Sequence, residues 1–240
     1  MPVHWYEGRV IDIKEMSPTT RQFFVSIGDE RFEFLPGQFV TMDLPVGDKR
    51  QQRWRSYSIA SHPDGGNVLE FCIVKADDGI GTKYLFEKVK RGDTLKFKGP
   101  DGTFILPKNL ENEIVMICTG TGIAPFRSML TYIREQQLGF HKIHLIFGTR
   151  NSSGILYKEE METMLRDYPN FKYDVALSRE SSDGHYHGYV HDIYMKNYLD
   201  IMPNRHFYLC GWSQMIDEAV ENIISKMGYD KSQVHYELYG

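Results

Sequence analysis

A glycine-rich turn at residues 119–125, Thr-Gly-Thr-Gly-Ile-Ala-Pro, narrows the possible folds of this 240-residue chain more than any other stretch. It follows an apolar run at 113–119, which predicts a buried strand. Pro125 fits the first turn of a helix, where no amide donor is needed, so a helix is expected over 125–133. Glycines at such a turn let backbone amides approach a pyrophosphate. The stretch therefore predicts a strand–turn–helix unit that binds a nucleotide phosphate.

The rest of the second half repeats this alternation of apolar strands and helical segments. A helical segment at 213–227 places apolar residues along one side, as an amphipathic helix does. Strands alternating with helices are typical of a doubly wound parallel α/β sheet, which we expect over residues 112–240. The further strands are expected at 142–147, 171–177 and 206–210, and a further helix at 157–168.

The first half has a different residue pattern, in which short apolar and aromatic runs are broken by Gly, Pro and Asp. Regular strand spacing with such turn signals predicts an antiparallel β-barrel, here over residues 1–107. The segment 106–110, Leu-Pro-Lys-Asn-Leu, is the expected linker between the two domains. The strands of the first half are expected at 10–13, 21–27, 38–44, 55–61 and 68–74.

The stretch at 53–61, Arg-Trp-Arg-Ser-Tyr-Ser-Ile-Ala-Ser, alternates like a β-strand. Arg55 and Tyr57 are then expected on one face, and Ser56 and Ser58 on the other. A guanidinium can fork onto a phosphate, a tyrosine can lie against an aromatic ring, and Ser58 can hydrogen-bond a ring nitrogen. The simpler alternative is an amphipathic strand with a surface arginine.

A second glycine-rich turn, at 78–82, runs into a helical pattern that we expect to begin near Thr82. Gly79 and Gly81 let the backbone approach a ligand closely, and a helix N-terminus attracts an anion. The turn could therefore bind a phosphate opposite Arg55. A capped surface helix is the alternative explanation.

Taken in order, these motifs resemble the ferredoxin-NADP reductase family. The resemblance rests on Arg-x-Tyr-Ser at 55–58, Gly-Ile-Gly-Thr at 79–82, Gly-Pro-Asp-Gly at 99–102 and the 119–126 turn, and it covers essentially the whole chain. It implies that the barrel binds FAD and that the α/β domain binds NADP(H). The flavin-binding residues implied are Arg55, Ser56, Tyr57 and Ser58, with Gly79, Gly81 and Thr82 at the FAD pyrophosphate.

The resemblance also implies a nicotinamide-nucleotide site in the second half. Its members are Thr121 and Gly122 in the 119–125 turn, Cys210 in the nicotinamide pocket, Ser178 and Arg179 at the 2′-phosphate, Arg150 at nearby phosphates, and Tyr189. Cations and hydroxyls after the later strands favour NADPH over NADH, although Glu180 follows Arg179 directly. The Glu-x-Tyr ending implies that Tyr239 covers the flavin and that Glu237 stands near the reaction, with Gly240 as one extra residue. The catalytic group implied is Tyr57, Ser58, Cys210, Glu237 and Tyr239.

Composition and charge exclude several other classes of protein. A net charge of −4 argues against nucleic acid as the main partner. The three cysteines, Cys72, Cys118 and Cys210, are too far apart for a plant-type iron-sulfur cluster. The histidines at 185, 187 and 191 lack a convincing ligand set, so no metal is expected. No run approaches a membrane span and the N-terminus lacks a signal-peptide pattern, so we expect a cytoplasmic protein without a membrane partner.

These observations predict a flavoprotein that passes hydride between NADPH and FAD and single electrons between FAD and ferredoxin or flavodoxin. One alternative is the reductase component of an oxygenase, which shares the chemistry but not the acceptor. A second is a flavin-bearing electron-transfer subunit of a larger complex. A non-catalytic binding module would have little reason to keep Arg55, Tyr57, Ser58 and the 119–125 turn together.

Overall fold

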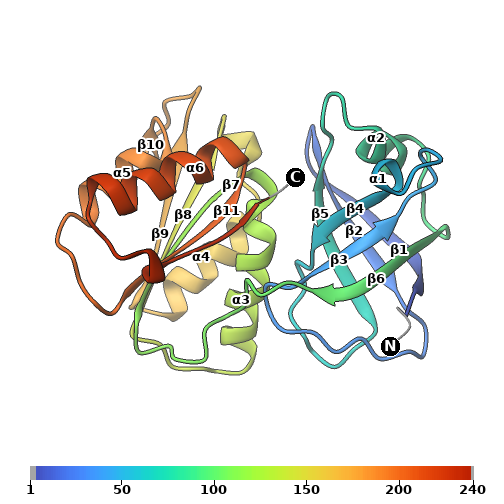
Figure 1. The fold of residues 1–240 in the computed structure, drawn as a ribbon, viewed down its shortest axis with the longest axis horizontal. Coiled ribbons are helices and arrows are strands. Elements are labelled where there is room, and N and C mark those ends of the chain that lie inside the picture. The colour runs from blue at the N-terminus through green and yellow to red at the C-terminus, as the bar shows by residue number, and fades with distance from the viewer. Residues whose placement is uncertain (1–3, 239–240) are drawn as a thin grey trace. The chain divides into compact units, whose positions relative to one another are not determined.

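The computed structural model describes residues 4–238, and the chain forms two compact units (Figure 1). The first unit runs to Leu106 and includes Ala124–Tyr132. The second comprises Pro107–Ile123 and the residues from Ile133 onward. None of the helices within residues 4–238 is long and apolar enough to cross a membrane.

The first unit is built on a six-stranded antiparallel sheet that closes on itself. The strand order is β4-β3-β6-β1-β2-β5, and a bridge between Ile59 and Phe71 joins the two ends. The amide of Ala60 reinforces this closure by donating to the carbonyl of Glu70 at 2.8 Å. The predicted antiparallel barrel is therefore confirmed. Its strands are β1 (Tyr6–Ser17), β2 (Thr20–Ser26), β3 (Phe39–Asp43), β4 (Trp54–Ser58), β5 (Val68–Val74) and β6 (Thr94–Asp101).

Two short helices accompany the barrel strands, α1 (Arg50–Arg53) directly before β4 and α2 (Ile80–Glu87) after β5. The barrel interior is filled by aliphatic and aromatic side chains, because alternate residues of each strand point inward. Among them, Phe23, Phe71 and Phe97 have no exposed surface. This apolar interior fixes the strand register and thereby the positions of the side chains at the strand ends.

The second unit is a six-stranded sheet in the order β10-β9-β8-β7-β11-β12, with every neighbouring pair parallel. The chain runs outward from β7 to β10 and then returns to place β11 beside β7, as in a doubly wound fold. The predicted parallel α/β sheet is therefore confirmed. Its strands are β7 (Glu113–Thr119), β8 (Lys142–Thr149), β9 (Phe171–Leu177), β10 (Tyr186–His187), β11 (Arg205–Gly211) and β12 (Val234–Leu238).

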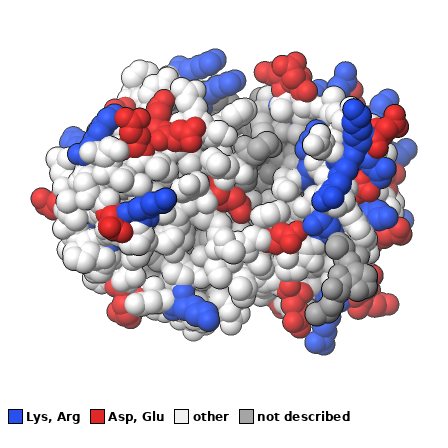
Figure 2. All heavy atoms as spheres, in the orientation of Figure 1, with Lys and Arg blue, Asp and Glu red and all other residues white. Residues whose placement is uncertain are grey.

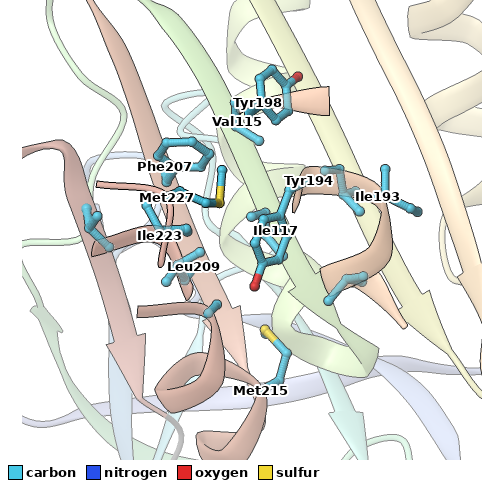
Figure 3. Close-up of a cluster of buried hydrophobic side chains, with 14 of the residues drawn as sticks. Val115, Ile117, Ile193, Tyr194, Tyr198, Phe207, Leu209, Met215, Ile223 and Met227 are labelled. Carbon is cyan, nitrogen blue, oxygen red and sulfur yellow. The ribbon is translucent and has the colours of Figure 1, made fainter. Parts of the chain in front are cut away.

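Helices connect these strands, and α5 and α6 lie on one face of the sheet (Figure 1). Figure 3 shows the apolar cluster beneath them, in which Ile117 and Leu209 meet side chains from both helices. The burial of this cluster orients β7 and β11, whose carboxyl ends carry the residues expected to bind nucleotide. The helices are α3 (Ile123–Glu135), α4 (Lys158–Asp167), α5 (Val190–Asn197) and α6 (Ser213–Glu221).

Several elements differ from those expected from the sequence. β6 and α5 were not expected, and α2 begins at Ile80 rather than near Thr82. The helix expected over 213–227 is α6 followed by a π-helical turn at Asn222–Lys226. The buried Asn222 begins this turn and donates from Nδ2 to the hydroxyl of Tyr194 at 2.9 Å. π-Helical segments in proteins are usually single turns of this kind within or beside α-helices.

A buried ion pair joins β7 and β11 at the amino ends of the strands. The guanidinium of Arg205 donates from Nε to Glu113 Oε2 at 2.7 Å, and their side chains are 7% and 5% exposed. Lys142 Nζ lies 2.6 Å from the other Glu113 oxygen. Burial by itself raises the pKa of Glu113, but the hydrogen bonds from Lys142 and Arg205 outweigh it and lower this pKa below 4.5. The carboxylate is therefore charged in the folded protein.

We expect Arg205→Met to lower the free energy of unfolding by about 3–5 kcal/mol, because it leaves Glu113 charged and buried with only Lys142 beside it. The contribution of Glu113 is present above its usual pKa and is lost as the pH falls through its lowered folded-state pKa. Urea denaturation at neutral and acidic pH measures both effects. The control is Glu162→Gln in the exposed Lys158–Glu162 pair, where we expect a loss below about 1 kcal/mol. Equal losses in the two variants would contradict this expectation.

Candidate functional site

Two of the predicted motifs adjoin each other in the first unit. The Arg55 side chain on β4 donates from one terminal nitrogen to the carbonyls of Gln51 at 2.8 Å and Trp54 at 2.7 Å. A Cβ atom added at Gly81 would lie 3.2 Å from Arg55 Cγ and 3.2 Å from Leu44 Cδ1. The start of α2 therefore packs directly against the Arg55 side chain, and any larger residue at position 81 would require the Arg55 and Leu44 side chains to shift.

Thr82 shapes the turn before α2. Its hydroxyl donates to the carbonyl of Gly79 at 3.1 Å and accepts from the amide of Ala76 at 3.1 Å. A side chain at Gly79 would place its Cβ atom 2.5 Å from the Thr82 hydroxyl oxygen. Gly79 and Thr82 thus fix the backbone of the turn at the start of α2. Free backbone amides at such a helix start, close to the Arg55 side chain, are suited to bind a phosphate.

The hydroxyl of Tyr57 is an unusual buried polar group. It is shielded from solvent and has no hydrogen-bond partner among residues 4–238. Burial raises the pKa of Tyr57 despite the nearby Arg55 charge, so the hydroxyl stays protonated. A buried hydroxyl without a partner costs about 1–3 kcal/mol. A bound flavin carries hydroxyl and phosphate oxygens that could supply the partner, so Tyr57, Arg55 and Gly81 fit FAD.

The two serines of the 55–58 motif have different surroundings. Ser58 is 6% exposed, whereas Ser56 is exposed with its hydroxyl oxygen 3.5 Å from that of Thr41. Strand alternation was expected to place both on one side of β4. Ser58 directly precedes Ile59, which forms the bridge to Phe71 that closes the barrel.

In the second unit, the predicted glycine turn forms a short 3₁₀ helix at Gly120–Gly122. A Cβ atom at Gly122 would lie 2.3 Å from the carbonyl oxygen of Cys210 and 2.7 Å from the Cα atom of Gly211. The hydroxyl of Thr119 accepts the Trp212 amide at 3.3 Å, a contact that sequence reasoning missed. The structure thus brings together two motifs about ninety residues apart, because both follow neighbouring parallel strands.

Cys210 and Glu237 are register partners on β11 and β12. Cys210 is fully buried, and its neighbour Leu209 packs toward α5 and α6, so successive side chains of β11 face opposite sides of the sheet. Thr121 lies in the 3₁₀ turn beside Cys210. Tyr239, the other expected member of this group, lies outside the described residues.

The residues expected at the 2′-phosphate follow β8 and β9. The amide of Ser178 donates to the Thr149 carbonyl at 3.0 Å, and that of Arg179 donates to the Arg150 carbonyl at 2.8 Å. Arg150 and Arg179 are both exposed and therefore accessible to a ligand. Tyr189 precedes α5 and is 66% exposed. All these residues lie at the carboxyl edge of the sheet, where α/β folds bind ligands.

Two of the three histidines at 185, 187 and 191 have protein partners. His187 Nδ1 lies 3.0 Å from the Glu180 carbonyl, and His191 Nε2 lies 2.9 Å from Glu218. Within residues 4–238, no cluster of three or more His, Cys, Asp or Glu residues could hold a metal ion. Basic and acidic side chains are intermixed on the face drawn in Figure 2.

Models of two protein families match the two halves of the chain. The Oxidoreductase FAD-binding domain matches residues 7–105, and the Oxidoreductase NAD-binding domain matches residues 116–221. The fold, the Arg55–Gly81 contact and the Gly122–Cys210 contact are consistent with these two assignments. The chain is therefore a flavin oxidoreductase with FAD-binding and NAD-binding domains.

Individual relatives narrow the class further. Ferredoxin--NADP reductase B of Sorangium cellulosum is 30% identical over 98% of this chain and 97% of its own length. The toluate 1,2-dioxygenase electron transfer component of Pseudomonas putida is 30% identical over 98% of this chain and 67% of its own. The chain belongs to the ferredoxin-NADP reductase family. A crystal structure of a ferredoxin NADP+ reductase from Neisseria gonorrhoeae with FAD and NADP shares the fold, with a TM-score of 0.81, 24% identity, and 98% and 99% coverage.

Proposed function

We propose that this protein uses NADPH to reduce a small electron-carrier protein, ferredoxin or flavodoxin. The observation that best supports this proposal is the close packing of Gly122 on Cys210 and Gly211, because it brings the glycine turn and the end of β11 together at the carboxyl edge of the sheet, where a nicotinamide nucleotide could bind. The similarity to the Sorangium ferredoxin reductase over almost the whole of both chains supports a carrier protein as the acceptor.

FAD would be held by the barrel. Arg55 and the amides around Gly81 would bind its phosphates, while Tyr57 and Ser58 would contact the part of the cofactor nearer the flavin ring. When bound, FAD supplies the chemistry that accepts a hydride from NADPH and releases electrons one at a time. The protein's own contribution is to orient the cofactor and to keep the Tyr57 hydroxyl neutral.

NADPH would be held by the α/β unit. Backbone amides of the Gly120–Gly122 turn approach its pyrophosphate, and Thr121 and Cys210 line the nicotinamide end. Ser178, Arg179 and Arg150 recognise the 2′-phosphate, and Tyr189 offers an exposed ring near the nucleotide. Glu237 stands beside Cys210 in the sheet, where its carboxylate can hold or move a proton near the nicotinamide. Tyr239 would cover the flavin when NADPH is absent.

A second candidate is the reductase component of an oxygenase. The similarity to the toluate dioxygenase electron transfer component supports it, and this chain spans 67% of that relative. The chemistry at FAD and NADPH would be shared, and only the acceptor protein would differ.

The purified protein, loaded with FAD, distinguishes these candidates in one assay. We expect NADPH to support faster turnover than NADH, and ferredoxin or flavodoxin to accept electrons from the protein. Turnover only with an oxygenase component would favour the second candidate. Failure to bind FAD or to oxidise either nucleotide would contradict both.

We expect Tyr57→Phe to weaken FAD binding about three- to tenfold, because it removes one hydrogen bond of about 0.5–1.5 kcal/mol. The protein without FAD should be as stable as the parent protein or more so, because the variant removes a buried hydroxyl that lacks a partner. Fluorescence titration with FAD measures the affinity, and thermal melts of the FAD-free variant and the FAD-free parent protein measure the stability. A variant with lower stability in the absence of FAD would contradict this explanation.

A further inference from the structure

Glu180 makes a concentrated set of contacts beside the expected 2′-phosphate residues. One carboxylate oxygen accepts the amide of Ser152 at 2.8 Å, and the other accepts the Ser152 hydroxyl at 2.8 Å. Ser152 opens the 3₁₀ turn at Ser152–Gly154, two residues after Arg150. The carboxylate thus joins the loop that follows β9 to the loop that follows β8.

The backbone around Glu180 extends this connection. Arg179, the residue before it, bonds to the carbonyl of Arg150 at 2.8 Å. The carbonyl of Glu180 itself lies 3.0 Å from Nδ1 of His187 on β10. Three segments are therefore tied together at one residue, and two of them carry the exposed arginines.

The charge of Glu180 makes this placement informative. Hydrogen bonds from the Ser152 amide and hydroxyl lower the pKa of Glu180, so the carboxylate is ionised at neutral pH. An ionised carboxylate close to a 2′-phosphate would repel it and favour NADH. Here both carboxylate oxygens accept hydrogen bonds from Ser152, so the negative charge lies between the loop that follows β8 and the loop that follows β9.

We propose that Glu180 is a positioning residue for NADPH selectivity, which holds the loop of Arg150 against that of Arg179 through Ser152 so that both arginines can bind the 2′-phosphate. The inference rests on the proposed use of NADPH. It distinguishes Glu180 from the carboxylates that bind a ribose 2′-hydroxyl in NAD-dependent proteins, because this carboxylate acts on the protein and not on the nucleotide.

Calorimetric titration of the FAD-loaded protein with 2′,5′-ADP and with 5′-AMP tests this role without turnover. The two probes differ only in the 2′-phosphate. We expect Ser152→Ala and Glu180→Ala each to weaken 2′,5′-ADP binding about three- to tenfold, the range for losing hydrogen bonds to a charged group at an exposed site. Binding of 5′-AMP should change less than about twofold, because the rest of the nucleotide site is intact.

Two further variants separate position from charge. Glu180→Gln removes the charge but keeps an oxygen that can accept from Ser152, so we expect it to retain most of the selectivity of the parent protein. Glu159→Gln removes an exposed carboxylate from the first turn of α4 and should leave the affinities for both probes unchanged. Melting temperatures of all variants show whether each remains folded.

Three outcomes would overturn the inference. Unchanged selectivity in Ser152→Ala and Glu180→Ala would show that the contact between Ser152 and Glu180 does not contribute to recognition of the 2′-phosphate. Tighter 2′,5′-ADP binding in both Glu180→Ala and Glu180→Gln would show that Glu180 acts by repulsion alone. Equal affinity of the parent protein for the two probes would overturn the proposed NADPH preference as well, and this result is recognised before any variant is made.

Discussion

Gly122→Ala is expected to lower kcat/KM for NADPH by about 100-fold or more, because displacement of a binding loop by about 1 Å can cost that much in rate. The added Cβ atom would lie 2.3 Å from the Cys210 carbonyl oxygen and 2.6 Å from its carbon. These neighbours are backbone atoms and cannot rotate away, so either the 3₁₀ turn or the end of β11 must move. Steady-state kinetics with NADPH and an artificial electron acceptor measure the loss.

The FAD content of the Gly122→Ala variant should equal that of the parent protein, because the expected FAD-binding residues belong to the other unit. Gly139→Ala is the matched control, since a Cβ atom there meets nothing within 4 Å. Normal NADPH kinetics in Gly122→Ala would contradict the assignment of this turn to the nucleotide site.

Arg55→Ala is the second change with a large expected effect. We expect FAD affinity to fall at least about 100-fold, because two hydrogen bonds to a charged phosphate contribute a net of about 1.5–3 kcal/mol each. Arg55→Lys should retain part of the affinity, since an ammonium keeps the charge but cannot form the two-pronged contact. Flavin absorbance after gel filtration and titration of the FAD-free protein measure the affinities.

Arg53→Ala is the control for this experiment. Arg53 lies two residues away on the same segment, but its guanidinium is paired with Asp43 through contacts of 2.8 and 2.7 Å. We expect this variant to purify with its normal content of FAD. Loss of FAD in Arg53→Ala but not in Arg55→Ala would overturn the placement of the phosphate at Arg55.

The main lines of the fold follow from hydrophobic patterning. The unbroken apolar run of β7 and the glycines after it predicted a buried parallel strand and its turn, because only such a strand is apolar on both faces. The proximity of Gly122 to Cys210 was implied by the family resemblance, and the structure accounts for it because β7 and β11 are adjacent parallel strands whose carboxyl ends meet at one edge. The strand and its turn are thus determined by local sequence, whereas the order of the strands in the sheet is not.

Other features depend on contacts that the sequence does not reveal. The link between Ser152 and Glu180 spans 28 positions and is made by two loops, whose conformations carry no periodic signal. The π-helical turn begins at Asn222, whose buried side chain contacts Tyr194 on a different helix. β6 was missed although Leu95 and Phe97 alternate with lysines, because the strand runs into a Gly-Pro pair that is usual in turns.

The central claim is that one chain binds FAD in its barrel and NADPH in its α/β unit and passes a hydride between them. Anaerobic mixing of the FAD-loaded protein with NADPH or NADH, followed by flavin absorbance, tests it most directly. We predict that NADPH bleaches the flavin rapidly and that NADH does so more slowly. A protein that binds no FAD, or whose flavin is not reduced by either nucleotide, would contradict the account.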